Sequence, residues 1–314
     1  MRCVVTGGAG FIGSNLVESL LGRGWEVTVL DDLSTGKREN LAPFMAEGRL
    51  RLIVGSVTDR SACARACEGA DYVFHQAALC SVNVSISEPE RTLETNVTGT
   101  SNVFLAARSG GVKRVVWASS TAVYGNSDIL PNLETMPLLP LSPYAASKAA
   151  GEMLASAFSE VYGLSVISLR YFNVFGKRQD PSSAYAAVIP LFVSKLLRGQ
   201  RPVIYGDGGQ TRDFVHVENV AEANILAAAC AGEDASGRAF NIGCGESISI
   251  NELYRIIAGE LGSDLEPEYA PPRPGEVRDS VADIGAARAA FGYEPTVDVR
   301  EGLKRSLAWY RKNP

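Results

Sequence analysis

Histidine is the scarcest residue of this chain, with only His75 and His216 among 314 residues. Both lie in apolar, strand-like contexts, so we expect them to be structural, hydrogen-bonded side chains. The six cysteines are scattered, and only Cys63 and Cys67 stand four apart, which does not make a zinc site. We therefore expect no metal centre, and reduced thiols as in a cytoplasmic protein.

Long apolar runs and blocks of like charge are also missing. No stretch of about 18 apolar residues could span a membrane, and a motif that begins by residue 6 leaves no room for a signal peptide. The net charge of -5 argues against nucleic acid or a membrane surface as a partner. A hydrophobic content of 46% in a chain of this length predicts a large core and two lobes.

Short apolar runs alternate with helical patterns through the first half of the chain. Residues 2–7 and 26–31 flank a helical pattern at 11–24, which indicates a βαβ unit. Further apolar runs repeat this theme at 50–56, 71–78, 114–120 and 164–173. Because these runs are continuously hydrophobic, we expect strands that are covered on both faces, in a parallel sheet between layers of helices.

A glycine-rich turn follows the first apolar run. Gly7, Gly10 and Gly13 are three apart, after a strand and at the start of a helix. Glycine lets the backbone approach a diphosphate, whose charge then faces the helix N-terminus. The second strand ends in Asp31, where a carboxylate can bind the adenosine ribose. No Arg follows Asp31 directly, so NAD is favoured over NADP; the alternative is a glycine-rich turn with a coincidental Asp.

These patterns predict an α/β fold with a Rossmann-like, doubly wound parallel sheet. We assign residues 1–172 to an NAD-binding domain, with a return segment at about 213–245. After Asn173 the pattern loosens, and Gly- and Pro-rich stretches interrupt shorter elements. Residues 173–212 and 246–314 would form a smaller α/β lobe that binds the substrate.

Tyr144 and Lys148 stand four apart in a predicted helix that has Pro143 in its first turn. Residues at this spacing share a helix face. A cation beside a phenol lowers the phenol's pKa from about 10 toward neutrality, which makes it usable as an acid or base. An ordinary surface pair is the alternative. Ser120 ends the fifth apolar run, at the carboxyl edge where open α/β sheets bind ligands.

The chain resembles the extended short-chain dehydrogenases/reductases, of the nucleotide-sugar epimerase and dehydratase kind. The resemblance covers nearly the whole chain. It rests on the order of nine motifs: TGGAGFIG, DDLSTG, HQAA, NVTGT, SSTAVYG, YAASK, RYFNVFG, RDFVHV and RPGE.

This resemblance implies a site for NAD. Asp31 and Asp32 would hold the adenosine ribose, and Ala77 and Ala78 would line the nicotinamide side. In relatives an Asp usually binds the adenine amino group at the position of Ser56. The other implied cofactor contacts are Gly7, Gly10, Phe11, Ile12, Gly13, Ser34, Thr35, Gly36, Ser56, Val57, Gln76, Asn96 (which would steady the middle of the site), Ser119, Tyr144, Lys148, Phe172 and Val174.

The catalytic set implied by the resemblance is Ser120, Tyr144 and Lys148. Tyr144, ionised by Lys148 and the nicotinamide cation, would take the proton of a sugar hydroxyl as NAD takes hydride from the same carbon. Relatives that dehydrate carry an Asp-Glu pair directly after the catalytic Ser or Thr, whereas this chain has Thr121 and Ala122. We therefore expect epimerisation at C4 through a transient 4-keto sugar, with tightly bound NAD.

The resemblance also implies a UDP-sugar substrate. Arg212 and Arg273 match two family arginines that grip the diphosphate, a task suited to the guanidinium fork. Ser280 stands where hexose-specific relatives often carry a bulky Tyr, so a 2-N-acetyl group would fit. The implied substrate contacts are Ser81, Ser120, Thr121, Tyr144, Asn173, Ala187, Val188, Tyr205, Arg212, Arg273, Glu276 and Ser280.

Three functions remain open from the sequence. The first is 4-epimerisation of UDP-N-acetylglucosamine, together with UDP-glucose. The second is a 4-epimerase restricted to UDP-glucose or UDP-glucuronate. The third is a non-catalytic NAD-binding sensor, against which the intact Ser120, Tyr144 and Lys148 argue. Relatives pair the helices expected at 93–110 and 143–163 with their copies in a four-helix bundle, so we expect a homodimer.

Overall fold

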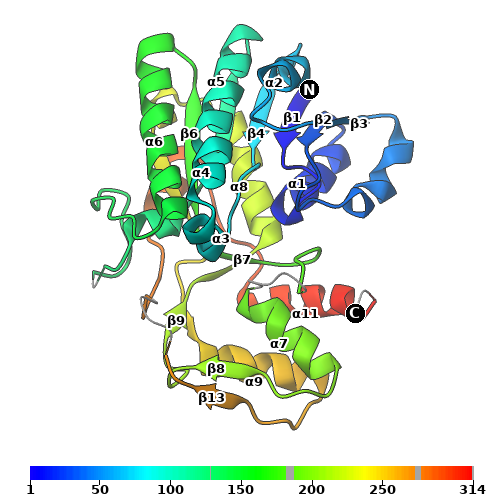
Figure 1. Ribbon diagram of the computed structural model, residues 1–314, viewed down its shortest axis with the longest axis vertical. Helices are drawn as coiled ribbons and strands as arrows, with labels where there is room; N and C mark the ends of the chain where they lie inside the picture. Colours follow the sequence, from blue (N-terminus) through cyan, green and yellow to red (C-terminus); the bar gives the residue numbers. More distant parts are fainter. Residues whose placement is uncertain (128, 182–186, 273–276, 313–314) are drawn as a thin grey trace.

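A seven-stranded parallel sheet is the framework of the computed structural model, which describes residues 1–127, 129–181, 187–272 and 277–312 (Figure 1). The strand order is β11-β6-β5-β4-β1-β2-β3, and every neighbouring pair is parallel. The strands are β1 (Arg2–Thr6), β2 (Glu26–Asp31), β3 (Leu50–Val54), β4 (Tyr72–His75), β5 (Arg114–Ser120), β6 (Val166–Tyr171) and β11 (Ala239–Ile242). This confirms the α/β fold with a Rossmann-like sheet.

Helices cover both faces of this sheet. Successive strand residues point to opposite faces, so Val5 packs beneath one layer and Val4 beneath the other. The first layer contains α1 (Phe11–Gly22) and α8 (Val217–Ala229). The second contains α2 (Arg60–Cys67), α5 (Gly99–Ser109) and α6 (Pro143–Tyr162). The predicted return segment thus supplies both α8 and the edge strand β11.

Short helices lie in the connections between these elements. Among the described residues they are η1 (Arg38–Asn40), η2 (Ala42–Glu47), α3 (Val82–Ser87), α4 (Pro89–Leu93), the π-helix η3 (Glu94–Thr98), η4 (Thr121–Tyr124) and η5 (Glu233–Ala235). The segments α4, η3 and α5 follow one another directly, and they lie beside α6 in Figure 1. No described helix is long and apolar enough to cross a lipid bilayer.

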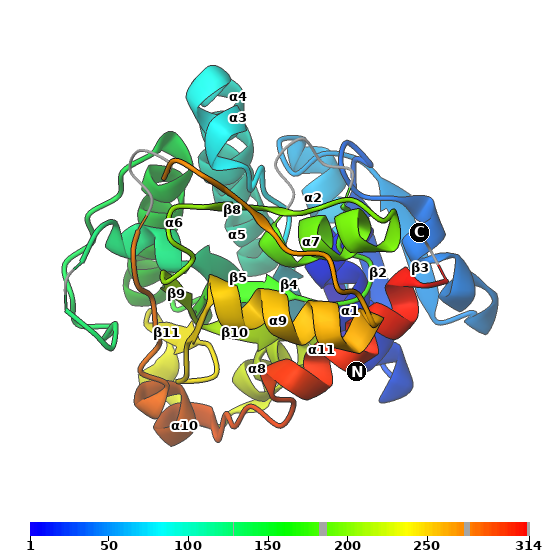
Figure 2. The same ribbon diagram turned by 90° about the horizontal axis from the view of Figure 1, so that it is seen from below.

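A smaller layer of helices and short strands lies below the carboxyl ends of the strands (Figure 2). Its helices α7 (Val188–Leu197), α9 (Ile250–Leu261) and α11 (Val299–Tyr310) share a core around Phe192, Leu253 and Leu303. Its strand pairs are β7 (Asn173–Phe175) with β10 (Phe214–His216), β8 (Val203–Tyr205) with β13 (Glu268–Ala270), and β9 (Thr211–Arg212) with β12 (Ile248–Ser249). In contrast, α10 (Gly285–Phe291) packs on the sheet edge, where the ring of Phe291 lies 5.3 Å from that of Phe240.

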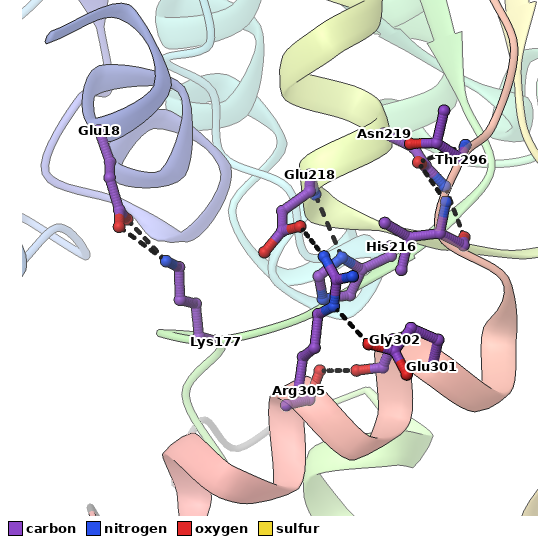
Figure 3. Close-up of polar contacts among 11 residues, drawn as sticks. Glu18, Lys177, His216, Glu218, Asn219, Thr296, Glu301, Gly302 and Arg305 are labelled. Atoms are coloured by element: carbon purple, nitrogen blue, oxygen red, sulfur yellow. Dashed lines mark hydrogen bonds and ion pairs between the residues drawn. The ribbon is translucent and has the colours of Figure 1, made fainter. Parts of the chain in front are cut away.

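The C-terminal helix α11 is attached to the sheet domain by polar contacts (Figure 3). Arg305 forms an ion pair with Glu218 of α8 at 2.6 Å. The amide of Asn219 bonds the backbone of the segment before α11, accepting from Thr296 N–H at 3.1 Å. Nearby, Lys177 pairs with Glu18 of α1 at 2.8 Å. These contacts hold the smaller layer against α1 and α8.

Both histidines are structural, as expected. His75 is fully buried between the hydroxyls of Thr6 and Thr100, at 2.6 and 3.0 Å. His216 is buried at the start of α8, where its Nδ1 accepts from the N–H of Glu218 (Figure 3). Burial lowers the pKa of His75 to about 3 and that of His216 to about 4, so both are neutral at physiological pH.

Candidate active site

The glycine turn between β1 and α1 is packed too tightly for any side chain. A Cβ on Gly7 would lie 2.8 Å from the backbone of Ala77, and Gly7 has a φ of 66° that favours glycine. A Cβ on Gly13 would lie 2.1 Å from the carbonyl oxygen of Gly7. The turn therefore presents bare backbone at the N-terminus of α1, beside the end of β4. This cradle fits a dinucleotide diphosphate.

Asp31 lies against the same turn. Its buried carboxylate accepts from the N–H of Ala9 at 2.9 Å and from the N–H of Leu33 at 2.8 Å. Burial raises the pKa of Asp31, although these two backbone bonds oppose the shift. Asp32 is exposed and accepts from the N–H of Ser34 at 2.9 Å. Each oxygen of Asp31 can accept a second bond, which suits the two hydroxyls of a ribose.

Two expected cofactor residues have side chains that are occupied by structural contacts. The amide of Gln76 donates to Asn224 of α8 at 3.0 Å and accepts from the hydroxyl of Tyr171 at 3.1 Å. The hydroxyl of Ser56 accepts from that of Thr58 at 2.9 Å. Neighbouring backbone, such as that of the buried Val57, can still face a cofactor at these positions.

Asn96 joins three segments at the middle of the site. Its Oδ1 accepts from the N–H of Leu79 at 2.8 Å, and its Nδ2 donates to the carbonyl of Leu79 at 3.0 Å. The same Nδ2 also donates to the hydroxyl of Ser147 in α6 at 3.0 Å. Because Asn96 is almost fully buried in the π-helix η3, these bonds hold the segment after β4 against α6.

The structure brings Ser120, Tyr144 and Lys148 together. Ser120 ends β5, and Tyr144 lies in the first turn of α6, which begins here because Ser142 caps the N–H of Ala145 at 3.1 Å. Ser120 lies near enough to the Tyr144 hydroxyl to lower its pKa. Lys148 follows one turn later, with its Nζ 5.9 Å from the centre of the Tyr144 ring.

Burial dominates the electrostatics of this group. It raises the pKa of Tyr144 well above that of a free phenol; nearby Cys80 adds to the shift, and the neighbouring Ser120 opposes it. It also lowers the pKa of Lys148, whose ammonium donates to the carbonyl of Ala118 at 2.7 Å. We expected Lys148 to bring the pKa of Tyr144 toward neutrality. In this structure the single buried cation does not outweigh desolvation.

The expected substrate residues lie on several elements below the strand ends. Arg212 donates to the carbonyls of Thr211 and Arg278, each at 2.8 Å, which joins β9 to the segment before Ser280. Ser280 is 8% exposed, and its hydroxyl has no hydrogen-bond partner among the described residues. Ser81 caps α3, Thr121 begins η4, Asn173 begins β7, Ala187 and Val188 begin α7, and Tyr205 ends β8. Arg273 and Glu276 lie outside the described residues.

Comparison with known proteins identifies the family. The model of the NAD dependent epimerase/dehydratase family matches residues 3–243. The chain belongs to this family. NAD is accordingly its cofactor, and the glycine cradle and Asp31 fit that molecule.

Several relatives in this family match the chain over nearly its full length. The UDP-glucose 4-epimerase of Mycolicibacterium smegmatis is 40% identical over 99% of this chain and 99% of that protein. A dTDP-glucose 4,6-dehydratase of Streptomyces griseus is 37% identical over 99% of this chain and 94% of that protein. The solved UDP-N-acetylglucosamine 4-epimerase of Methanobrevibacter ruminantium, in complex with UDP-N-acetylmuramic acid, is 42% identical with a TM-score of 0.94, over 100% of this chain and 99% of that chain.

Sequence reasoning missed Asp213, which organises the substrate side of this epimerase/dehydratase site. Its fully buried carboxylate accepts from the N–H groups of Cys244, Gly245 and Ala282 at 2.7, 3.0 and 3.1 Å. Two distant segments, 244–245 and the one that carries Ala282, are therefore bonded to the residue after Arg212. The RDFVHV motif contained this Asp, but a short-range pattern does not show that its partners lie about 30 and 70 residues away.

Asp213 should make stability depend on pH. Burial raises its pKa to about 6, so the folded protein binds a proton there at a pH where the unfolded chain does not. The stability that this proton contributes is present at low pH and is lost as pH rises through 6. Relative to Asp213→Asn, which does not titrate, the wild type should gain about 1 kcal/mol between pH 7 and pH 5.

Denaturant unfolding of both proteins at pH 5, 6 and 7 measures this difference. Asp59→Asn is the control, because hydrogen bonds from Ser61 lower the pKa of Asp59 and keep its titration below this range. The difference between wild type and Asp59→Asn should stay constant. The prediction would be contradicted if the difference in unfolding free energy between wild type and Asp213→Asn also stayed constant across this pH range.

Proposed function

We propose that the protein is an NAD-dependent 4-epimerase of UDP-sugars. It would interconvert UDP-N-acetylglucosamine and UDP-N-acetylgalactosamine, and also UDP-glucose and UDP-galactose, through a transient 4-keto sugar with tightly bound NAD. The observation that carries this proposal is the meeting of Ser120, Tyr144 and Lys148 at the carboxyl edge of the sheet, next to the glycine cradle.

NAD, when bound, supplies a reversible hydride acceptor. The chain's own residues bind it and move the proton. The backbone of the glycine turn and Asp31 would hold the dinucleotide. Tyr144 would exchange a proton with the sugar O4 while Ser120 bonds the same oxygen. The charge of Lys148 favours the phenolate of Tyr144 whenever that proton leaves, and the burial of Lys148 strengthens this attraction.

Epimerisation is favoured over dehydration by the two residues directly after Ser120. The resemblance places an Asp-Glu pair after the catalytic hydroxyl in dehydrating relatives, to remove a proton and expel water. In this chain Thr121 and Ala122 occupy those positions in η4, and neither can act as a carboxylic acid or base. An oxidised sugar held here can instead be reduced again from its other face, which inverts C4.

Ser280 supports an N-acetylated sugar. Its side chain is small, and its buried hydroxyl has no partner among the described residues, although buried polar groups are rarely left unbonded. An acetamido group would supply a hydrogen-bond partner and fill the space that a Tyr would occupy. A 4-epimerase restricted to UDP-glucose or UDP-glucuronate is the alternative enzyme, and a non-catalytic NAD-binding sensor is the alternative of another class. NMR of the pure protein incubated with four UDP-sugars separates these possibilities.

The protein would act as a homodimer through α5 and α6. These helices lie side by side on one face of the sheet in Figure 1, and they carry exposed apolar side chains. On and next to α5 these are Leu93 and Leu105, and on α6 they are Met153, Val161 and Tyr162. Pairing with a second copy would cover this apolar surface.

Tyr144→Phe should keep the fold and the bound NAD but reduce turnover by about 10²-fold or more, as expected for a positioned acid–base group. Epimerisation rate and NAD content measure the two effects. Tyr72→Phe, at the far end of β4, is the matched control and should turn over normally. Near-normal activity of Tyr144→Phe would refute the assignment.

Ser280→Tyr should reduce kcat/KM for UDP-N-acetylglucosamine about tenfold or more, because overpacking costs roughly 1–3 kcal/mol. Activity on UDP-glucose should survive. Ser280→Ala, which keeps the space, should retain both activities within a few-fold. If both activities of Ser280→Tyr fall together, Ser280 is a packing residue; if neither changes, it faces away from the substrate.

Light scattering at micromolar concentration should give the mass of a dimer. Met153→Glu, which places a charge on the exposed face of α6, should shift the mass toward that of a monomer. Ile129→Glu places a charge on an equally exposed apolar residue outside α5 and α6, and it should leave the measured mass unchanged. A monomeric wild type would rule out the dimer.

A further inference from the structure

Three residues on one face of α6 each face a different residue at the end of β5. Tyr144, Lys148 and Glu152 are spaced four apart and form one stripe along the helix. The pairs are Tyr144 with Ser120, Lys148 with Ala118 (Nζ to O, 2.7 Å) and Glu152 with Ser119 (Oγ to Oε1, 2.6 Å). The first two residues of the stripe belong to the proposed catalytic set, and Glu152 lies one turn further along α6.

Glu152 is held by a second strand as well. Arg170 of β6 donates from Nε to Oε1 at 2.9 Å and from Nη2 to Oε2 at 2.7 Å, which is the forked geometry that fixes orientation. In the register of β5 and β6, Arg170 is the direct partner of Ser119, so both side chains face α6. The remaining Nη1 of Arg170 donates to the hydroxyl of Tyr124 at 2.8 Å.

Stability is a weak reason for this ion pair. The side chains of Arg170 and Glu152 are 5% and 8% exposed, and removing two charges from water offsets much of their attraction. The pair does have two consequences for the site. It fixes the position of α6 along β5, and its carboxylate opposes the effect of burial by raising the pKa of Lys148.

We propose that Glu152 is a positioning residue for the reaction. Its pair with Arg170 sets α6 against β5 so that Tyr144 meets Ser120, and its negative charge lies beside the ammonium of Lys148 and favours it. The identity of the reaction rests on the proposed function, whereas the contacts of Glu152 do not.

Glu152→Gln keeps the shape of the side chain and removes its charge. The titratable and charged groups around Tyr144 and Lys148 in the described chain are Cys80 after β4, His75 in β4, Glu152 in α6, and Arg170 in β6 behind it. The substitution removes the negative charge of Glu152 and leaves the positive charge of Arg170 without its partner. Both changes make Tyr144 and Lys148 lose their protons more easily. The pH profile of kcat should therefore shift to lower pH, by about half a unit or more.

Loss of positioning should also reduce kcat about tenfold while KM stays within about twofold. Ser119→Ala, which breaks one bond and keeps the ion pair, should reduce kcat less and leave the pH profile unmoved. Arg114→Gln is the matched control: it removes a buried guanidinium from the opposite end of β5, where Arg114 bonds the carbonyl of Cys230 at 2.6 Å. It should lower stability without moving the profile.

Ionisation of Tyr144 can be measured without turnover. The near-ultraviolet absorbance of phenolate, taken as the difference from a matching Tyr144→Phe protein, should titrate at lower pH in Glu152→Gln than in wild type. A wild type inactive on every UDP-sugar would overturn the proposed function, and this titration would still decide the role of Glu152. An unmoved titration, or a loss of activity through KM alone, would overturn that role. If Glu152→Gln fails to fold, an unchanged kcat in Ser119→Ala overturns it instead.

Discussion

The close approach of α6 to β5 is the contact on which the site depends. Gly151 makes it possible, because a Cβ there would lie 2.3 Å from the ring of Trp117 in β5. This approach buries Lys148, whose ammonium lies 5.1 Å from the centre of the same ring and reaches the carbonyl of Ala118. A helix even slightly farther away would leave Lys148 in water, where its charge would act on Tyr144 only weakly.

Burial at this contact determines the chemistry of the polar groups. The same desolvation that raises the pKa of Tyr144 lowers the pKa of Lys148, so burial opposes the charged form of each side chain. Glu152, one turn away, opposes this for Lys148, and Arg170 fixes the position of the Glu152 carboxylate. A cofactor that brings positive charge into the cleft would favour the phenolate further. In the proposed mechanism, proton transfer at Tyr144 would therefore depend on several charges arranged along α6.

The substrate side is organised by a second buried carboxylate. Asp213 gathers the backbone of two segments next to Arg212, including the one that carries Ser280. These segments join the sheet domain through α8, α10 and the polar contacts of α11 in Figure 3. The residues that would choose the sugar are thus held on connections between elements, where small changes in side-chain size are tolerated more easily than in the sheet.

The parallel sheet, the glycine turn and the helix that presents Tyr144 and Lys148 could all be predicted from the amino-acid sequence, because each depends on local spacing and continuous hydrophobic runs. The same spacing put Glu152 one turn after Lys148, but nothing local revealed its bond to Ser119 or its pair with Arg170. Three other features emerged only from the folded chain: Gln76 turns to α8, Asp213 holds distant backbone, and burial outweighs Lys148 at Tyr144. Hydrogen-bond partners and desolvation depend on which elements meet in space, and short-range sequence patterns do not contain that information.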